Sequence, residues 1–233
     1  MSNKTIAILL AAGSGKRMNS EIHKQYLTLK GKPVLYYALK VFEESFLDEI
    51  ILVVGSGEVE YCKNEIVNRY GFSKVSKVIE GGAERYHSVY KGILAIDLCD
   101  YLFIHDGARP FVSREILNRA LLAVKQHKAC VVGMPVKDTV KIIDENRFIS
   151  ETPKRDLVWS VQTPQCFSFS IIKDAYHQLM MQEDQLLQNK IQISDDAMVL
   201  ELLSDIPVKL VEGSYENIKI TTKEDMKIAE SLF

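Results

Sequence analysis

Two glycines and three basic residues stand close together near the start of the chain and could bind a triphosphate. The stretch LLAAGSGKRM contains Gly13, Gly15, Lys16 and Arg17, and Lys24 follows seven residues after the arginine. Glycines let a backbone approach phosphates closely, and backbone amides with added cations suit the roughly four negative charges of a nucleoside triphosphate. We therefore expect these residues to bind the phosphates of a nucleotide.

The glycine-rich stretch matches neither of the two common phosphate-binding patterns completely. The ATP-binding pattern has a glycine five residues before its Gly-Lys pair and a hydroxyl after it, whereas Leu10 and Arg17 occupy these positions. The dinucleotide pattern fits Gly13 and Gly15, but Met18 replaces its third glycine. An ordinary strand-to-helix turn would also explain the glycines. The three basic residues that follow them favour a triphosphate-binding loop over such a turn.

An aspartate at the end of a predicted strand could hold a metal ion. Asp106 follows the apolar run YLFI and His105, at the carboxyl edge where open α/β sheets bind their ligands. A carboxylate there can hold Mg²⁺ on a triphosphate, so we expect a magnesium-dependent enzyme with Asp106 as its metal residue. A helix cap or a partner for Arg109 is the alternative role of this carboxylate. His105 is expected to pack or to hydrogen-bond.

Apolar runs that predict buried strands alternate with helical patterns, and this alternation must position the candidate residues. Strands are expected at TIAILLAAG, EIILVVG, KVSKVIEGG, YLFIHDGA, ACVVGMPV and PVKLVEG. Helices are expected after Pro33, from about Glu58 to Tyr70, through Val89 and Ile96, after the cap Ser113, near Ser170, after Ser194, and at a capping box of Thr221 and Glu224. The order predicts an α/β fold with a Rossmann-like, doubly wound and mostly parallel sheet.

Residues 137–160 break this alternation and predict a β-hairpin. Apolar and polar residues alternate there around a turn at Asp144–Asn146. We interpret the segment as an arm that projects from one domain spanning residues 1–233. An isolated hairpin is marginally stable in water, so its apolar positions, such as Val140 and Ile142, need a cover. A two-fold partner is the commonest solution, because most soluble oligomers are symmetric.

The composition argues against several classes of protein. The net charge of −2 gives no basic stripe for nucleic acid, and no apolar run reaches the about 20 residues of a membrane helix. The four cysteines stand more than thirty residues apart without a CxxC pair, so we expect reduced thiols and neither a zinc cage nor disulfides. We interpret the apolar start as mature structure and expect a cytoplasmic protein that binds neither nucleic acid nor membrane.

Several motifs in a fixed order resemble those of the sugar- and polyol-phosphate nucleotidyltransferases. LLAAGSGKRMNSEIHKQYL is similar to the signature L-A-A-G-x-G-x-R-M…P-K-Q-[YF], with His23 in place of the usual proline. GGAERYHSV, HDGARPF, PVKDTVK, RDLVWSVQTPQCF and NIKIT follow in the family's order. From Ala7 to Ala229 the chain resembles the methylerythritol phosphate cytidylyltransferases of non-mevalonate isoprenoid biosynthesis. The resemblance implies transfer of CMP from CTP to a polyol phosphate.

The resemblance also implies roles for individual residues. Arg17 and Lys24 would neutralise the charge that develops on the α-phosphate and pyrophosphate. The residues that would bind the nucleotide are Leu10, Ala11, Ala12, Gly13, Gly15, Gly81, Gly82, Ala83, Ser88 and Gly107. Of these, Gly81, Gly82, Ala83 and Ser88 would contact the cytosine. Ala83 stands where the family often has aspartate. The residues that would hold the phosphate and polyol of the second substrate are Asp138, Thr139, Arg155, Thr163 and Lys219.

An acidic pair and the arm complete what the resemblance implies. Asp195 and Asp196 match a pair in the family, but we interpret them as charges in the first turn of a helix and leave them outside the site. The family exchanges its arms within a homodimer, so Asp138, Thr139 and Arg155 would complete the active site of the partner.

Three other functions are compatible with parts of the sequence. Ribitol 5-phosphate cytidylyltransferases share most of the motifs, and HDGARP and PVKDTVK favour the methylerythritol enzymes. A nicotinamide-dependent oxidoreductase would use the pair Tyr36 and Lys40, which lies too early in the chain. A non-catalytic nucleotide sensor would have no need for Arg17, Lys24 and Asp106 together. The second substrate brings an ionised phosphate, so the reaction needs no general base.

Overall fold

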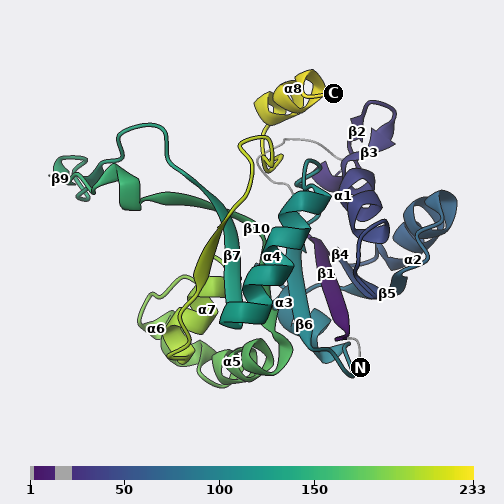
Figure 1. Cartoon of the computed structure of the whole chain (residues 1–233), viewed down its shortest axis with the longest axis horizontal. Helices are drawn as coiled ribbons and strands as arrows, with labels where there is room; N and C mark the ends of the chain where they lie inside the picture. Colours follow the sequence, from purple (N-terminus) through teal and green to yellow (C-terminus); the bar gives the residue numbers. More distant parts are fainter. Residues whose placement is uncertain (1–2, 14–22) are drawn as a thin grey trace.

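A central β-sheet organises the part of the chain that the structure describes. The computed structural model describes residues 3–13 and 23–233, so the predictions for Gly15, Lys16 and Arg17 lie outside the described residues. Seven of the described strands form one sheet in the order β11-β7-β10-β6-β1-β4-β5 (Figure 1). Their bounds are β1 Thr5–Ala11, β4 Glu49–Val54, β5 Val75–Glu80, β6 Tyr101–Asp106, β7 Ala129–Pro135, β10 Trp159–Ser168 and β11 Lys209–Glu212.

The strand directions confirm the predicted mostly parallel sheet. β1 pairs in parallel with both β4 and β6, β4 with β5, and β7 with β11. The strand β10 is antiparallel to both of its neighbours, β6 and β7. The carboxyl ends of β1 and β6 therefore lie side by side, with Leu10 paired to Asp106.

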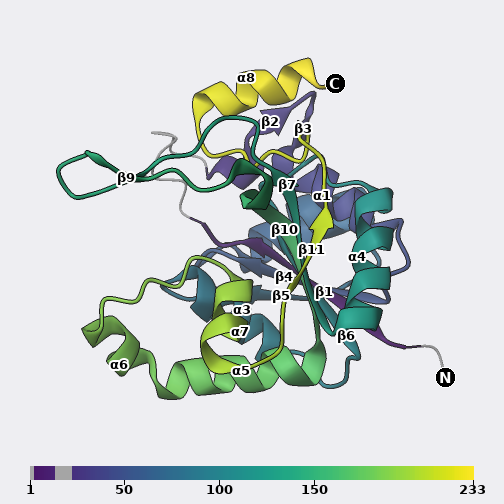
Figure 2. The ribbon, with the colours of Figure 1, turned by 60° about the vertical axis from the view of Figure 1, so that its left-hand side comes forward.

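Helices cover both faces of the sheet and bury alternate side chains of its strands (Figure 2). α1 (Val34–Glu43) and α4 (Arg114–His127) pack on the face that carries Ala7 and Leu9. α3 (Arg85–Leu94), α5 (Phe169–Met181) and α7 (Asp196–Leu203) pack on the opposite face, against Ile6 and Ile8. This alternation follows from the two-residue period of a strand.

Shorter elements complete the described fold. α2 (Val59–Tyr61) continues into a π-helical segment, Cys62–Asn68, where the sequence predicts one helix. α6 (Glu183–Gln188) follows α5, and α8 (Lys223–Ser231) packs beside the small hairpin of β2 (Thr28–Leu29) and β3 (Lys32–Pro33). The described helices include none with the length and apolarity needed to cross a bilayer.

The N-terminal caps of α4 and α8 can be compared with the caps predicted from the sequence. Ser113 caps α4 as predicted, because its hydroxyl accepts the amide of Ile116. The predicted capping box at Thr221 and Glu224 is wrong by one residue. Thr222 and Asp225 form the box, and the Asp225 carboxylate accepts the amides of both Thr221 and Thr222. Because the Asp225 side chain reaches the amides of both threonines, either threonine could have been the cap from the sequence alone.

The strand β10 was not expected from the sequence, which predicts no strand between the arm and the helix near Ser170. Pro164 lies in the middle of this segment, and proline cannot donate a hydrogen bond to a sheet. The structure accommodates it by a register shift against β7 between Val161 and Gln165. β10 then pairs with both β6 and β7, so it is an interior strand.

The predicted hairpin arm is confirmed, with a shorter range. β8 (Ile142–Ile143) and β9 (Ile149–Glu151) pair antiparallel, and Asp144 accepts two amides in the turn between them. Because β10 begins at Trp159, the arm spans residues 137–158. It extends away from the body on the left of Figure 1. Several of its large apolar side chains are exposed, Phe148 by 72% and Leu157 by 77%, so the described chain alone does not cover them.

Candidate active site

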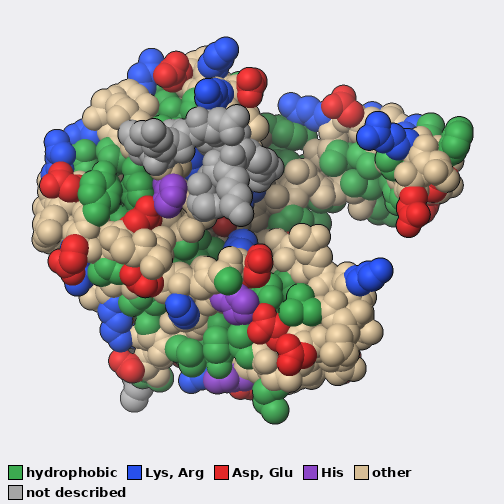
Figure 3. Space-filling view, turned by 180° about the vertical axis from the view of Figure 1, so that it is seen from behind, with side chains coloured by type: hydrophobic (Ala, Val, Ile, Leu, Met, Phe, Trp, Pro, Cys, Tyr) green, Lys and Arg blue, Asp and Glu red, His purple; other side chains and the backbone are tan. Residues whose placement is uncertain are grey.

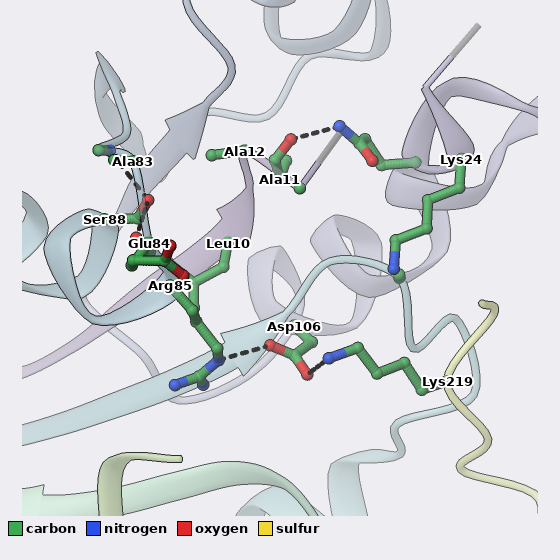
Figure 4. Close-up of a pocket in the computed structure, with 14 residues that line it drawn as sticks. Leu10, Ala11, Ala12, Lys24, Ala83, Glu84, Arg85, Ser88, Asp106 and Lys219 are labelled. Atoms are coloured by element: carbon green, nitrogen blue, oxygen red, sulfur yellow. Dashed lines mark hydrogen bonds and ion pairs between the residues drawn. The ribbon is translucent and has the colours of Figure 1, made fainter. Parts of the chain in front are cut away.

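A pocket opens where β1 and β6 end, and we call it the strand-end pocket (Figure 4). Segments that are far apart in sequence meet there: the end of β1, the turn at Lys24, the loop between β5 and α3, the end of β6, and the segment before α8. The described residues that line it are Leu10, Ala11, Ala12, Gly13, Lys24, Gln25, Gly82, Ala83, Glu84, Arg85, Ser88, Asp106, Ala108 and Lys219.

The structure brings most of the predicted nucleotide residues to this pocket. Gly81 and Gly107 lie just behind it and contact its walls. Thr163 lines a neighbouring depression together with Arg85 and Asp106. Asp138, Thr139 and Arg155 are exposed on the arm, which stands clear of the body across an open gap (Figure 3). One chain therefore does not bring these three residues into its own strand-end pocket.

The loop after β5 is held in place by side chains of α3. Gly82 donates its amide to the Ser88 hydroxyl over 3.0 Å, and Lys91 donates to the carbonyl of Gly81 over 2.7 Å. A Cβ on Gly81 would lie 2.6 Å from both Ala12 Cβ and Ser88 Oγ, closer than real contacts allow. Glycine at position 81 therefore lets this loop approach the end of β1, and the Ser88 hydroxyl supports the loop backbone.

Gly107 has a similar packing role at the end of β6. Its amide donates to the carbonyl of Leu10 over 2.9 Å. A Cβ on Gly107 would lie 2.7 Å from Leu35 Cδ1 and 3.1 Å from the Leu10 carbonyl oxygen. The residue thus allows β6 to close against β1, and direct contact of Gly107 with a nucleotide stays a prediction.

Lys24 lies in a 3-10 turn, Lys24–Tyr26, on the far side of the pocket from Arg85 (Figure 4). The buried side chain of Gln25 donates to the carbonyl of Ala11 and ties this turn to the end of β1. A Cβ on Gly13 would lie 3.9 Å from Lys24 Cε, so the lysine stem passes over this glycine. The side chain of Lys24 therefore lies beside Gly13 in the lining of the pocket.

Asp106 carries the strongest local electrostatics of the pocket. Its carboxylate is 2.7 Å from Lys219 Nζ and 3.4 Å from Arg85 Nε. Burial by itself would raise the pKa of Asp106, but Arg85, Lys219 and Arg109 together hold that pKa well below its usual range. The carboxylate is therefore ionised. The sequence suggested Arg109 as an alternative partner of Asp106, but the two cations that contact its carboxylate directly are Arg85 and Lys219.

Arg85 and Asp196 were not assigned to the site by the sequence analysis. Both terminal nitrogens of Arg85 bind the two carboxylate oxygens of Asp196, over 2.8 and 2.7 Å. Asp196 is fully buried and also accepts the hydroxyl of Tyr176 over 2.6 Å. The interpretation as a helix-terminus charge holds for Asp195, which caps α7, and is incomplete for Asp196. Arg85 stands in GGAERYHSV, so this motif was the available signal.

A chain of hydrogen bonds runs behind Asp106. The amide of Asp106 donates to the Thr163 hydroxyl, which is 3.0 Å from His105 Nδ1, and His105 Nε2 is 3.3 Å from the carbonyl of Arg109. Burial lowers the pKa of His105 to about 4, so its imidazole is neutral and hydrogen-bonds as expected. The Thr163 hydroxyl is already engaged here, and its predicted contact with the polyol stays a prediction.

The acidic residues of the pocket bear on the expected magnesium ion. The pocket is lined by two carboxylates, Glu84 and Asp106. Among residues 3–13 and 23–233 no group of three or more acidic, histidine or cysteine side chains could form a metal cage. Mg²⁺ usually binds one or two carboxylates and takes its other ligands from phosphates and water. The residues present thus fit an ion that arrives with a triphosphate.

Comparisons with known proteins agree with this geometry. The model of the 2-C-methyl-D-erythritol 4-phosphate cytidylyltransferase family matches residues 5–233. The enzyme of that name from Lachnoclostridium phytofermentans is 49% identical over 229 residues, which cover 98% of this chain and 96% of that protein. Its counterpart from Lachnospira eligens is 50% identical over 224 residues, 96% of each chain. The solved 4-diphosphocytidyl-2C-methyl-D-erythritol synthase of Anaerococcus prevotii has a TM-score of 0.85 at 34% identity, covering 99% of this chain and 96% of that one.

Proposed function

Because the chain belongs to the family of 2-C-methyl-D-erythritol 4-phosphate cytidylyltransferases, we propose that the strand-end pocket is where it performs that family's reaction. The enzyme transfers CMP from CTP to the phosphate of 2-C-methyl-D-erythritol 4-phosphate and releases pyrophosphate, a step of isoprenoid precursor biosynthesis. One observation supports this pocket above others. The glycine-rich strand end, Lys24, the loop after β5 and Asp106 all line it.

The charges of the pocket suit an in-line attack of one phosphate on another. The attacking phosphate of the polyol is already mostly ionised near neutral pH, with a second pKa of about 6, so it needs no general base. The enzyme must orient two anions and cancel their repulsion. Lys24, with Arg17, would neutralise the charge that develops on the α-phosphate and the leaving pyrophosphate. The loop at Gly82 and Ala83 would bind the cytosine, where close backbone walls exclude a larger purine.

Lys219 and Asp106 would act at the junction of the two substrates. Lys219 already lies against the Asp106 carboxylate and would hold the phosphate of the polyol. Asp106 would bind Mg²⁺, and a magnesium ion on the triphosphate would supply additional neutralisation of its charge. Arg85, fixed by Asp196, would keep the carboxylate of Asp106 oriented toward the pocket.

A pyrophosphate-release assay tests the substrates. With Mg²⁺ and 2-C-methyl-D-erythritol 4-phosphate, CTP should support a kcat/KM at least on the order of a hundredfold above that of ATP, because the site would reject a purine by size. Ribitol 5-phosphate should be a poor acceptor, since all three relatives described above carry the methylerythritol name. Equal rates with ATP would contradict the cytosine site, and faster turnover of ribitol 5-phosphate would contradict the polyol assignment.

A substitution at Asp106 tests the metal proposal. Asp106→Asn keeps the shape of the side chain but removes the charge that attracts a cation. We expect kcat to fall on the order of tenfold or more, and the Mg²⁺ concentration for half-maximal rate to rise. Asp97→Asn is the matched control, because Asp97 is exposed and far from the pocket lining. A magnesium titration identical to that of the unmodified enzyme would assign Asp106 a structural role.

We further propose that residues 1–233 act as one catalytic domain in a homodimer with exchanged arms. Exposed apolar side chains on the arm, and the distance of Asp138, Thr139 and Arg155 from their own pocket, support this assembly. The four described cysteines are all free and buried, which suits the reducing cytoplasm where we expect the enzyme to act.

A further inference from the structure

We propose that Glu58 is a positioning residue that fixes Lys24 over the strand-end pocket by binding the residues on both sides of it. The inference rests on the proposed role of Lys24 and extends it to a carboxylate outside the pocket lining. Glu58 precedes α2 on the next strand-to-helix connection, and neither the motifs nor the pocket singled it out.

The contacts of Glu58 join two separate segments of the chain. One carboxylate oxygen, Oε1, is 2.5 Å from Nδ1 of His23. The other oxygen, Oε2, accepts the hydroxyl of Tyr26 over 2.7 Å and the amide of Gly55 over 2.8 Å. The carboxylate therefore connects the turn that carries Lys24 with the end of β4.

Glu58 can position Lys24 because its contacts lie before and after this lysine in the chain. His23 precedes the lysine, and Tyr26 ends the same 3-10 turn. A single 3-10 turn has few and poorly aligned hydrogen bonds of its own, so side-chain contacts are needed to fix it. Gln25 holds the turn to β1, and Glu58 holds it to β4. Lys24 is thus held from two neighbouring strands of the sheet.

His23 stands directly before Lys24 and sets the backbone at the start of the turn. Its φ of −62° and ψ of 139° lie in the region that proline prefers. Proline would keep this φ by its ring, but histidine is free to leave it. The close approach of the His23 imidazole to Glu58 restrains the same segment from the side chain instead, through proximity and not through a hydrogen bond, since Nδ1 makes none.

The surroundings of Glu58 favour these contacts. A Cβ on Gly55 would lie 2.7 Å from Glu58 Oε2, so the missing side chain leaves room for the carboxylate to reach the amide. Burial raises the pKa of Tyr26 above its usual value and that of Cys62, whose thiol is 3.0 Å from the same hydroxyl, to about 11. Both groups therefore keep their protons, and the Tyr26 hydroxyl donates to Glu58.

Kinetics of two substitutions test the inference. In Glu58→Ala, and to a smaller degree in Tyr26→Phe, we expect kcat to fall on the order of tenfold, because small misplacements of a catalytic group are costly. KM for CTP should change by less than about twofold, as expected when only transition-state interactions weaken. Glu60→Ala is the matched control, since Glu60 is an exposed neighbour that pairs with Lys63, and its kcat should be unchanged.

A double-mutant cycle distinguishes positioning from general damage. If Glu58 acts through Lys24, adding Glu58→Ala to Lys24→Ala should lower kcat by less than about twofold, because little remains to be positioned. A further drop as large as in the unmodified background would overturn the inference, and so would an unchanged kcat in Glu58→Ala and Tyr26→Phe. Normal activity of Lys24→Ala itself would overturn the proposed role of the lysine, so the two failures are told apart.

Discussion

Lys24→Ala will lower kcat on the order of a hundredfold or more while the protein keeps its fold. Charge-stabilising groups that are fixed before the reaction make contributions of this size, because they need not reorganise as charge develops. The lysine lies at the rim of the strand-end pocket and outside the apolar core, so its loss leaves the packing of the sheet intact. Steady-state pyrophosphate release and thermal melting, measured on the same preparation, check both parts.

Lys63→Ala is the control for this substitution. Lys63 is exposed, pairs with Glu60 and lies away from the pocket, so its variant should keep the unmodified kcat. If Lys24→Ala instead melts early while kcat per folded molecule survives, the lysine is structural. Arg17 lies outside the described residues, and from the sequence alone we expect Arg17→Ala to behave as Lys24→Ala does.

Mixing two inactive variants will restore about a quarter of the active sites in a two-fold assembly. The variants are Lys24→Ala, which damages the pocket, and Arg155→Ala, which damages the arm. If each arm completes the partner's site, a mixed dimer contains one site with both defects and one with neither. Random pairing after joint unfolding and refolding makes about half of the dimers mixed, and this gives the expected recovery.

The control and the contradicting result use the same variants. Each variant refolded alone should stay inactive, and a tag on one variant should confirm that mixed dimers have formed. If Lys24 and Arg155 served the same site from one chain, every site would carry one defect. A mixture that contains confirmed mixed dimers and is as inactive as its parents would therefore rule out the shared site.

Local signals predicted most of the fold because each one depends on a short stretch of chain. Ile6 and Ile8 alternate with Ala7 and Leu9 in an apolar run, and burial on both faces of β1 follows from that pattern alone. Ser113 caps α4 through an amide three residues away, so its role is visible in the sequence. The same reasoning failed for β10, where Pro164 hides an interior strand behind a register shift.

The candidate site was predictable where a motif stands at the end of a strand. Gly13, Lys24 and Asp106 belong to such motifs, and the parallel pairing of β1 with β6 brings their segments together. The pair of Arg85 and Asp196 is separated by 111 residues and depends on how α3 and α7 pack on the same face. A buried ion pair of this kind has no local pattern, because each partner by itself resembles an ordinary surface charge.

The way the arm leaves the sheet makes it a replaceable module. Pro135 at the end of β7 and Trp159 at the start of β10 are cross-strand partners, so the arm is topologically an enlarged hairpin loop between adjacent antiparallel strands. Outside Asp138, Thr139 and Arg155, which would complete the partner's site, residues 137–158 can therefore change in length or sequence without breaking a pairing of the central sheet. The arm surface that selects a partner can diverge around these three positions without altering the scaffold of the strand-end pocket, and an engineer could graft arms between such scaffolds to redirect which chains assemble.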